Sequence, residues 1–217
     1  MTGTPDLFSC GDTPAGKVDL VDAALEYLPE FFAEDRQRIL YEKLISELDW
    51  SQGQIKLYGR EHTIPRLEAW HGDPGARYGY SGTELEPQPW TPALHEIREA
   101  LISHRSDLNF NSVLGNWYRD GEDAMGWHSD DEKELGPEPV IASISLGDER
   151  RFLLRHRRRK ELQTHEITLE SGSLLLMRGE SQRAWRHSIP KTRRTVAPRI
   201  NLTYRHIMPA NGSIDAD

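Results

Sequence analysis

His128 and Asp130 place two metal-binding side chains one residue apart, with Ser129 between them. In a β-strand, residues i and i+2 point to the same face, so this imidazole and this carboxylate can converge on one ion. His187, in the strand-like segment 185–188, is the best candidate for a third ligand. Two histidines and one carboxylate form the facial triad that binds non-haem Fe(II) and leaves coordination positions open. Because His-x-Asp pairs also occur by chance, the alternative is a surface His128 and an ordinary hydrogen-bonded His187.

A second polar pattern lies near the end of the chain, where residues 199–205 alternate strictly between polar and apolar types. One strand face would carry Arg199, Asn201, Thr203 and Arg205. Guanidinium groups bind carboxylates through paired hydrogen bonds, so this face predicts a wall that binds a dicarboxylate. Asn116 and Tyr118 share a strand face in the same way and can donate to the same ligand. The alternative is an antiparallel strand with one face in water.

The elements that would hold these residues are two helices and a series of short strands. Apolar residues at helical spacing predict helices at 35–48, capped by Asp35, and at 92–103, capped by Thr91 with Pro92 in the first turn. Strands are predicted near 110–118, 140–146, 150–156, 164–170, 173–177, 184–189 and 199–206. Helices followed by many short strands indicate an α+β fold with a barrel or jelly-roll sheet.

Length and composition fit one domain. The chain has 217 residues, 36% of them hydrophobic, and its one cysteine cannot form an internal disulfide, which favours a reducing cytosol. It contains no apolar run long enough to cross a membrane, and its first residues lack the pattern of a secretory signal. We expect a flexible N-terminal tail at 1–18, a single domain at 19–210 and a C-terminal tail at 211–217.

Charge is distributed unevenly along the chain. The net charge of −8 argues against wholesale non-specific binding of nucleic acid. However, residues 119–138 contain eight acids against two bases, whereas residues 150–160 contain seven bases and no acid. Net charge is therefore a poor guide to partners.

Taken together, Asn116-x-Tyr118, His128-x-Asp130, His187 and the stretch from Arg199 to Arg205 resemble the AlkB family of Fe(II)- and 2-oxoglutarate-dependent dioxygenases. The resemblance covers roughly residues 50–207. Segments 116–132 and 198–205 look like the branch that contains the animal nuclear DNA-repair homologues and similar bacterial proteins. The resemblance implies an α+β fold with a double-stranded β-helix (jelly-roll) core and N-terminal helices packed against that core. It also implies a nucleotide-recognition segment around 50–85.

The resemblance also implies roles for individual residues. His128, Asp130 and His187 would hold Fe(II). Arg199 would pair with the distal carboxylate of 2-oxoglutarate, in a site completed by Asn116, Tyr118, Asn201, Thr203 and Arg205.

The substrate site would comprise Tyr58, Tyr78, Tyr80, Glu132 and Arg151. Tyr58 lies in a short finger that fills the gap left by an extruded base, although the family pattern has phenylalanine at this position. Tyr80, rather than Tyr78, would stack on that base, and Glu132 would contact its amino group. The nucleic-acid backbone would contact the basic run, chiefly Arg157, Arg158, Arg159 and Lys160, together with Lys191, Arg193 and Arg194.

The implied function is oxidative demethylation that repairs N-alkylated bases, such as 1-methyladenine and 3-methylcytosine, in DNA. The co-substrates would be 2-oxoglutarate and O2, and the products formaldehyde, succinate and CO2. A base inside a duplex is unreachable, so it must be flipped out before reaction. The expected partner is alkylated DNA or RNA, with no membrane. We expect a monomer in the bacterial cytoplasm, or in the nucleus if the source is eukaryotic.

Two other readings stay open at this point. A 2-oxoglutarate oxygenase acting on a protein or small molecule would need neither a basic platform nor a base-stacking residue. A nucleic-acid-binding module with a structural metal is disfavoured because structural zinc sites are normally closed and rich in cysteine. The sequence alone does not separate DNA from RNA as substrate.

Overall fold

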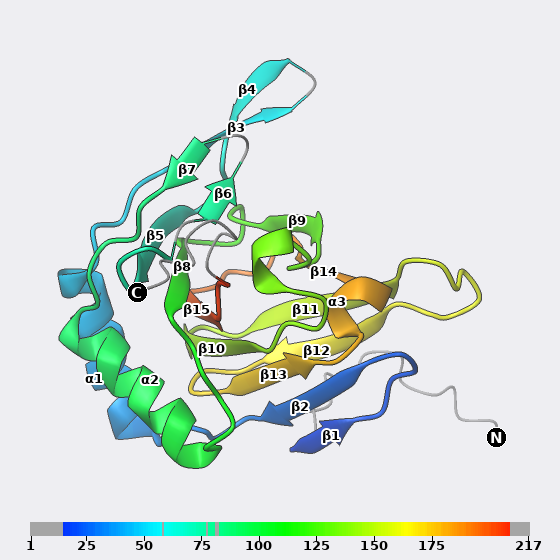
Figure 1. The fold of residues 1–217 in the computed structure, drawn as a ribbon, viewed down its shortest axis with the longest axis horizontal. Coiled ribbons are helices and arrows are strands. Elements are labelled where there is room, and N and C mark those ends of the chain that lie inside the picture. Colours follow the sequence, from blue (N-terminus) through cyan, green and yellow to red (C-terminus); the bar gives the residue numbers. More distant parts are fainter. Residues whose placement is uncertain (1–14, 58, 77, 81–82, 209–217) are drawn as a thin grey trace, which may run out of the picture.

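Two antiparallel sheets face each other in the computed structural model, which describes residues 15–57, 59–76, 78–80 and 83–208. The major sheet has the order β1 (Gly16–Val18), β2 (Ala24–Leu28), β13 (Leu174–Arg178), β10 (Ile141–Gly147), β15 (Arg199–Arg205), β8 (Ser112–Tyr118) and β5 (Leu67–Gly72). The minor sheet has the order β12 (His165–Leu169), β11 (Arg150–His156), β14 (Trp185–Ile189) and β9 (Met125–His128). This double sheet is the expected jelly-roll core (Figure 1).

Helices α1 (Glu34–Glu47) and α2 (Pro92–His104) cover the outer face of the major sheet (Figure 1). Two short hairpins, β3 (Gln54–Leu57) with β4 (Arg60–Thr63) and β6 (Tyr78–Tyr80) with β7 (Thr83–Leu85), project together at the top of the same view. The short helices η1 (Lys133–Leu135) and α3 (Ser181–Ala184) lie beside the minor sheet.

Strand β15 lies near the centre of the major sheet, and all seven of its residues are buried. Ile200, Leu202 and Tyr204 pack in the cluster under the helices, where the Tyr204 hydroxyl donates to the carbonyl of Leu94 at 2.9 Å. The four polar residues of the strand therefore face the space between the sheets. The predicted alternation is confirmed, but the alternative of a water-exposed face is wrong because both faces are covered.

The seven predicted strands correspond to β8, β10, β11, β12, β13, β14 and β15, and the two predicted helices to α1 and α2. The expected order is incomplete, since β1 and β2 precede α1, five further strands lie between the helices, and β9 lies between β8 and β10. Gly16–Val18 form β1 although they were assigned to the tail, whereas residues 1–14 and 211–217 lie outside the described residues.

The two helix caps differ from each other. The backbone N–H of Leu94 donates to Thr91 Oγ1 at 3.4 Å, so the predicted cap of α2 is confirmed. The predicted cap of α1 is wrong, because Ala33 is the N-cap residue and Asp35 lies in the first turn. Helix α1 thus begins without a side-chain cap.

Thr91→Ala should lower the free energy of unfolding by about 1 kcal/mol, since it removes the side-chain acceptor at the start of α2. Thr91→Ser keeps the hydroxyl and should retain most of the stability. Urea denaturation of both variants measures the difference. An equal loss in the two would show that the threonine methyl, not the cap, is responsible.

Candidate metal centre and co-substrate cavity

Three metal-binding side chains converge between the sheets. The ligand atoms of His128, Asp130 and His187 all lie within 4.8 Å of one another. The two imidazole Nε2 atoms are 3.1 Å apart, and His187 Nε2 is 3.6 Å from Asp130 Oδ2. An imidazole nitrogen lies ~2.0–2.1 Å from a bound transition-metal ion, so two such nitrogens at right angles are about 3.0 Å apart. The donor set and its spacing therefore fit Fe(II) bound by a facial triad.

The β14–β9 pairing and one backbone contact orient the two histidines. His187 on β14 is directly opposite His128 on β9. His128 Nδ1 lies 2.9 Å from the carbonyl oxygen of Gly126, so Nδ1–H donates there and Nε2 is left as the ligand atom. The ring of Phe152 stacks on His187 with centroids 5.1 Å apart. The rings thus have fixed orientations before any metal binds.

Burial and charge set the protonation states that a metal requires. Burial, with the neighbouring His128 imidazole, lowers the pKa of His187 to about 3, so His187 is neutral at physiological pH. Burial alone would raise the pKa of Asp130, but the adjacent Arg205 guanidinium holds the pKa of this carboxyl below its ordinary value. A neutral imidazole and an ionised carboxylate are the ligand forms of these groups.

Asp130 is held by contacts rather than by a strand, because β9 ends at His128 and residues 129–132 have no regular structure. The expectation that both residues share one strand is therefore wrong for Asp130. Its backbone N–H donates to Gln182 Oε1 at 3.0 Å, and its carboxylate forms an ion pair with Arg205. Gln182 and Arg205 are both buried. The two ligands converge because Asp130 is fixed at its backbone and at its side chain.

Arg199 is a buried cation that forms no ion pair with an acidic side chain among the described residues. Its side chain is 1% exposed, and Nη2 donates to Ser145 Oγ at 2.9 Å. Its Nε and Nη1 have no hydrogen-bond partner among the described residues. Burial lowers the pKa of Arg199 to about 10, which leaves it cationic at neutral pH. A buried cation with two unused donors fits the carboxylate of a bound acid.

A narrow cavity connects Arg199 to the triad. Its lining includes the three predicted metal ligands and all six predicted co-substrate residues. The Tyr118 ring contacts two guanidinium groups, at 5.3 Å from that of Arg199 and 5.5 Å from that of Arg150. On β15, Thr203 donates to Asn201 Oδ1 at 3.2 Å, while Asn201 donates to Ser143 Oγ at 2.8 Å. The structure thus brings the two predicted sets together in one place.

The predicted substrate residues are placed less completely. Tyr58 lies outside the described residues, and Tyr78 and Tyr80 form β6, paired with β7. Glu132 is half-buried at the N-cap of η1, close in sequence to the triad but not among the residues that line the cavity. Arg151 does not join the site, because it is exposed on β11 and pairs with Glu166 at 2.6 Å.

The basic run does not form one surface. Arg150 is 4% exposed and donates to the backbone carbonyls of Asp120, Asp123 and Pro190, so it is a structural residue. Arg157 pairs with Asp131, and Arg159 with Asp22 at 3.4 Å. Arg158 is exposed and forms no ion pair with the residues that the structure describes.

Sequence reasoning missed several residues that support the site. Arg66 is buried and donates through Nε to Asn116 Oδ1 at 2.6 Å, which turns the Asn116 amide N–H groups away from it. Gln182 gave no sequence signal, because its role depends on a four-residue helix beside the triad. Ser143 and Ser145 were detectable, since they share one face of a predicted strand and lie opposite Thr203 and Asn201.

Replacing each of the two arginines of β15 with methionine should have opposite consequences. In the metal-free protein, Arg205→Met leaves Asp130 buried without its ion pair and should cost about 3–5 kcal/mol. Arg199→Met removes a buried charge that has no acidic partner, so it should be neutral or stabilising. Thermal unfolding of both variants in chelator measures this difference, and equal losses would contradict the assignment.

Comparison with known proteins agrees with this geometry. Residues 24–205 match the 2OG-Fe(II) oxygenase superfamily. Mouse DNA oxidative demethylase ALKBH2 is 38% identical over 179 residues, covering 78% of this chain and 74% of the mouse protein. Human alpha-ketoglutarate-dependent dioxygenase alkB homolog 3 is 36% identical over 178 residues, covering 78% of this chain and 61% of the human protein.

Solved structures support the fold. A 2OG-Fe(II) oxygenase family oxidoreductase from Burkholderia pseudomallei aligns with a TM-score of 0.55 at 15% identity, covering 87% of each chain. The structure of OsALKBH1 aligns with a TM-score of 0.56 at 18% identity, covering 84% of this chain and 97% of that one. The expected fold, enzyme class and Fe(II), 2-oxoglutarate and O2 requirements are confirmed. The chain belongs to the 2OG-Fe(II) oxygenase superfamily and, within it, to the AlkB family.

Proposed function

We propose that this enzyme repairs DNA by oxidative demethylation of N-alkylated bases such as 1-methyladenine and 3-methylcytosine. The observation that carries the proposal is its 38% identity, over 179 residues, to a protein named DNA oxidative demethylase. The chemistry that bound Fe(II), 2-oxoglutarate and O2 supply is oxidation of the N-methyl carbon, which leaves as formaldehyde alongside succinate and CO2.

Different residues of the cavity would bind the metal, bind the co-substrate and exclude water. His128, Asp130 and His187 would hold Fe(II) through two imidazole nitrogens and one carboxylate oxygen. Arg199 would hold the distal carboxylate of 2-oxoglutarate with the two donors that it leaves unused. Tyr118 and Asn116 line the path between them. Apolar residues of the cavity wall exclude water from this region: Met125, Phe152, Leu169, Met177 and Ile189.

Substrate recognition would use the acidic segment and the projecting hairpins. A base methylated at N1 of adenine or N3 of cytosine is cationic and pairs poorly, which lowers the cost of flipping it out. Glu132 lies two residues after Asp130, so its carboxylate is suited to a positively charged ring near the metal site. Stacking of the base would fall to Tyr80 rather than Tyr78; both residues lie on β6, in the hairpin that β6 forms with β7.

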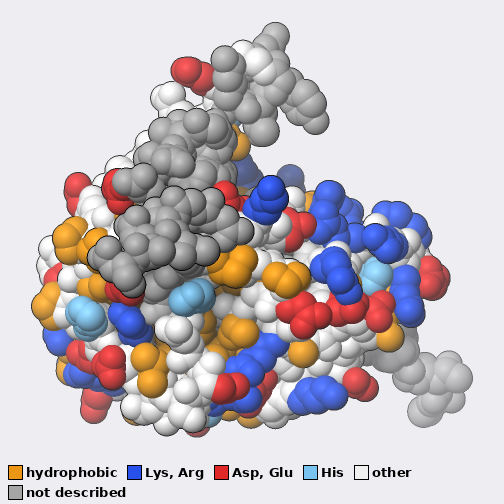
Figure 2. All heavy atoms as spheres, viewed as in Figure 1, with side chains coloured by type: hydrophobic (Ala, Val, Ile, Leu, Met, Phe, Trp, Pro, Cys, Tyr) orange, Lys and Arg blue, Asp and Glu red, His pale blue; other side chains and the backbone are white. Residues whose placement is uncertain are grey.

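A basic hollow at the end of β11 is suited to the nucleic-acid backbone. Figure 2 shows Lys and Arg side chains gathered at this end of the molecule. The hollow measures about 470 Å³, and its described lining contains no acid: Arg155, His156, Arg157, Arg158, Lys160, Arg183 and Arg186. Arg155 on β11 lies directly opposite Arg186 on β14. Like charges in that position repel each other, so a phosphate between them would relieve the repulsion.

We further expect a monomer that acts on alkylated DNA. No helix in the described residues is long and apolar enough to cross a membrane. Cytoplasmic location in a bacterium, or nuclear location in a eukaryote, stays a prediction.

The function is tested by reconstituting the protein anaerobically with Fe(II), then adding O2, 2-oxoglutarate and an oligonucleotide that contains 1-methyladenine. Succinate should form as the methyl group is lost, and His128→Ala should abolish both. Arg199→Ala should raise the KM for 2-oxoglutarate about tenfold or more, because a charge-assisted hydrogen bond is worth ~1.5–3 kcal/mol.

Arg105→Ala is the matched control for this assay, since Arg105 pairs with Asp107 and Glu26 away from the cavity. Its activity should equal that of the wild type. Succinate without demethylation would redirect the search to RNA, protein or small molecules. No succinate from the metal-loaded protein would contradict the enzyme assignment.

The nucleic-acid surface is tested by the salt dependence of binding. Each of Arg158→Ala and Arg186→Ala should weaken binding to duplex DNA and reduce the slope of log K against log salt by about 1. Fluorescence anisotropy at several salt concentrations gives the slope, with Arg105→Ala as control. Unchanged slopes in both variants would place the DNA elsewhere.

A further inference from the structure

Arg157 contacts the metal-binding segment from the basic loop that follows β11. Its Nη1 donates to Ser129 Oγ at 3.3 Å and forms an ion pair with Asp131. Ser129 and Asp131 are the two neighbours of the metal ligand Asp130 in the chain. One guanidinium nitrogen therefore bridges the residues on either side of a ligand.

The bridged segment depends on such contacts. Residues 129–132 belong to no helix or strand, so no sheet hydrogen bonds fix their backbone. Gln182 holds the N–H of Asp130, and Arg205 holds its carboxylate. The Arg157 bridge adds a third restraint, from the solvent side. Because an exposed ion pair adds little to global stability, its effect is on the local conformation of this segment.

The backbone of Arg157 is itself fixed. Its N–H donates to the carbonyl of Ala184 at 2.8 Å, and its carbonyl accepts from Lys160 Nζ at 3.3 Å. Ala184 ends α3, the short helix that carries Gln182. Arg157 and Gln182 therefore reach the metal-binding segment from neighbouring, hydrogen-bonded parts of the chain.

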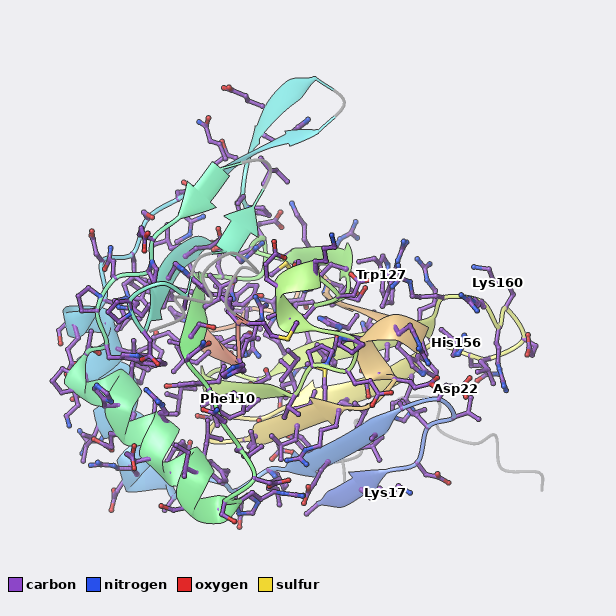
Figure 3. The ribbon with its side chains drawn as sticks, in the orientation of Figure 1. Lys17, Asp22, Phe110, Trp127, His156 and Lys160 are labelled. Atoms are coloured by element: carbon purple, nitrogen blue, oxygen red, sulfur yellow. The ribbon has the colours of Figure 1, made fainter. Side chains whose placement is uncertain are left out.

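The loop around Arg157 is anchored by His156. The His156 Nδ1 atom accepts from the backbone N–H groups of Arg158 and Arg159, at 3.2 and 2.9 Å. Its Nε2–H is then left to donate to Asp22, whose Oδ2 is 3.3 Å away. Figure 3 shows His156 beside Asp22, with Lys160 further out on the loop. This anchoring gives the Arg157 side chain a rigid base.

We propose that Arg157 is a positioning residue that holds Asp130 in its metal-binding conformation through Ser129 and Asp131, and is not a contact for DNA phosphate. This revises its expected role, while the adjacent Arg158, exposed and without an ion pair among the described residues, keeps the role of phosphate contact. The inference rests on the proposed function only for its DNA-binding readout.

The first measurement is Co(II) affinity, followed by the visible absorption of bound Co(II) in the absence of nucleic acid and 2-oxoglutarate. Partners that orient metal ligands typically contribute 10–100-fold in affinity. Since Arg157 acts one residue away from the ligand, Arg157→Ala and Asp131→Asn should each weaken binding about 3–10-fold. The double variant of Arg157→Ala and Asp131→Asn should bind Co(II) no more weakly than whichever single variant binds it less tightly. Arg157→Lys should recover most of the Co(II) affinity.

Arg158→Ala is the matched control, since it removes the neighbouring arginine of the same loop. Its Co(II) affinity should equal that of the wild type, whereas its DNA-binding salt slope should fall by about 1. Arg157→Ala should show the reverse pattern. Circular dichroism confirms folding, and Asp131→Asn tests the same bridge from its other end if Arg157→Ala is unstable.

Unchanged Co(II) affinity in Arg157→Ala and Asp131→Asn overturns the proposal. A salt slope that falls in Arg157→Ala as far as in Arg158→Ala also overturns it, in favour of a phosphate contact. Co(II) binding requires no demethylation. A wild-type protein that fails to repair DNA would therefore refute the proposed function, whereas the Co(II) affinities would still test the role of Arg157.

Discussion

The interior of the barrel contains two buried arginines on one strand and one buried carboxylate facing them. Arg205 is balanced by Asp130, whereas Arg199 has no acidic partner in the part of the chain that the structure describes. A divalent cation at the triad would add to this excess of positive charge, and a dianion bound beside it would offset the charge that the metal adds. Metal and dicarboxylate are therefore expected to favour each other's binding, because uncompensated charge is costly in a buried site. This demand for charge compensation explains why polar side chains of β15 and β10 face the interior.

The strands and loops contribute differently to the site. His187 and Arg199 lie within strands whose positions are fixed by ladders on both sides. Asp130 lies in an irregular segment that reaches the same cavity and depends on side-chain contacts. The sheets thus define where the metal lies, and the contacts to the segment complete the ligand set.

Much of the fold was predictable because strand periodicity is local. The alternation in 199–205 identified the polar inner face, and the same period would have placed Arg150 inside with Phe152 and Leu154. The many arginines in 150–160 mask that alternation, so the predicted basic surface is larger than the one in the structure. Gln182 and Arg66 were not predictable, because their partners come from distant segments of the chain. Strands β1 to β7 and β9 were not predicted; β1, β6 and β7 have only three residues each, too few to show an alternation.

The pairing of β2 with β13 brings residues 24–28 beside residues 174–178, and β5 and β15 both pair with β8. A topology so rich in contacts between distant segments has a high contact order, which slows folding because long loops must close before the contacts form. The three ligands also come from separate strands and segments, so none of them is near another in the unfolded chain except His128 and Asp130. The metal site is consequently complete only late in folding, after the two sheets have formed, so a newly made chain binds its metal at the end of folding.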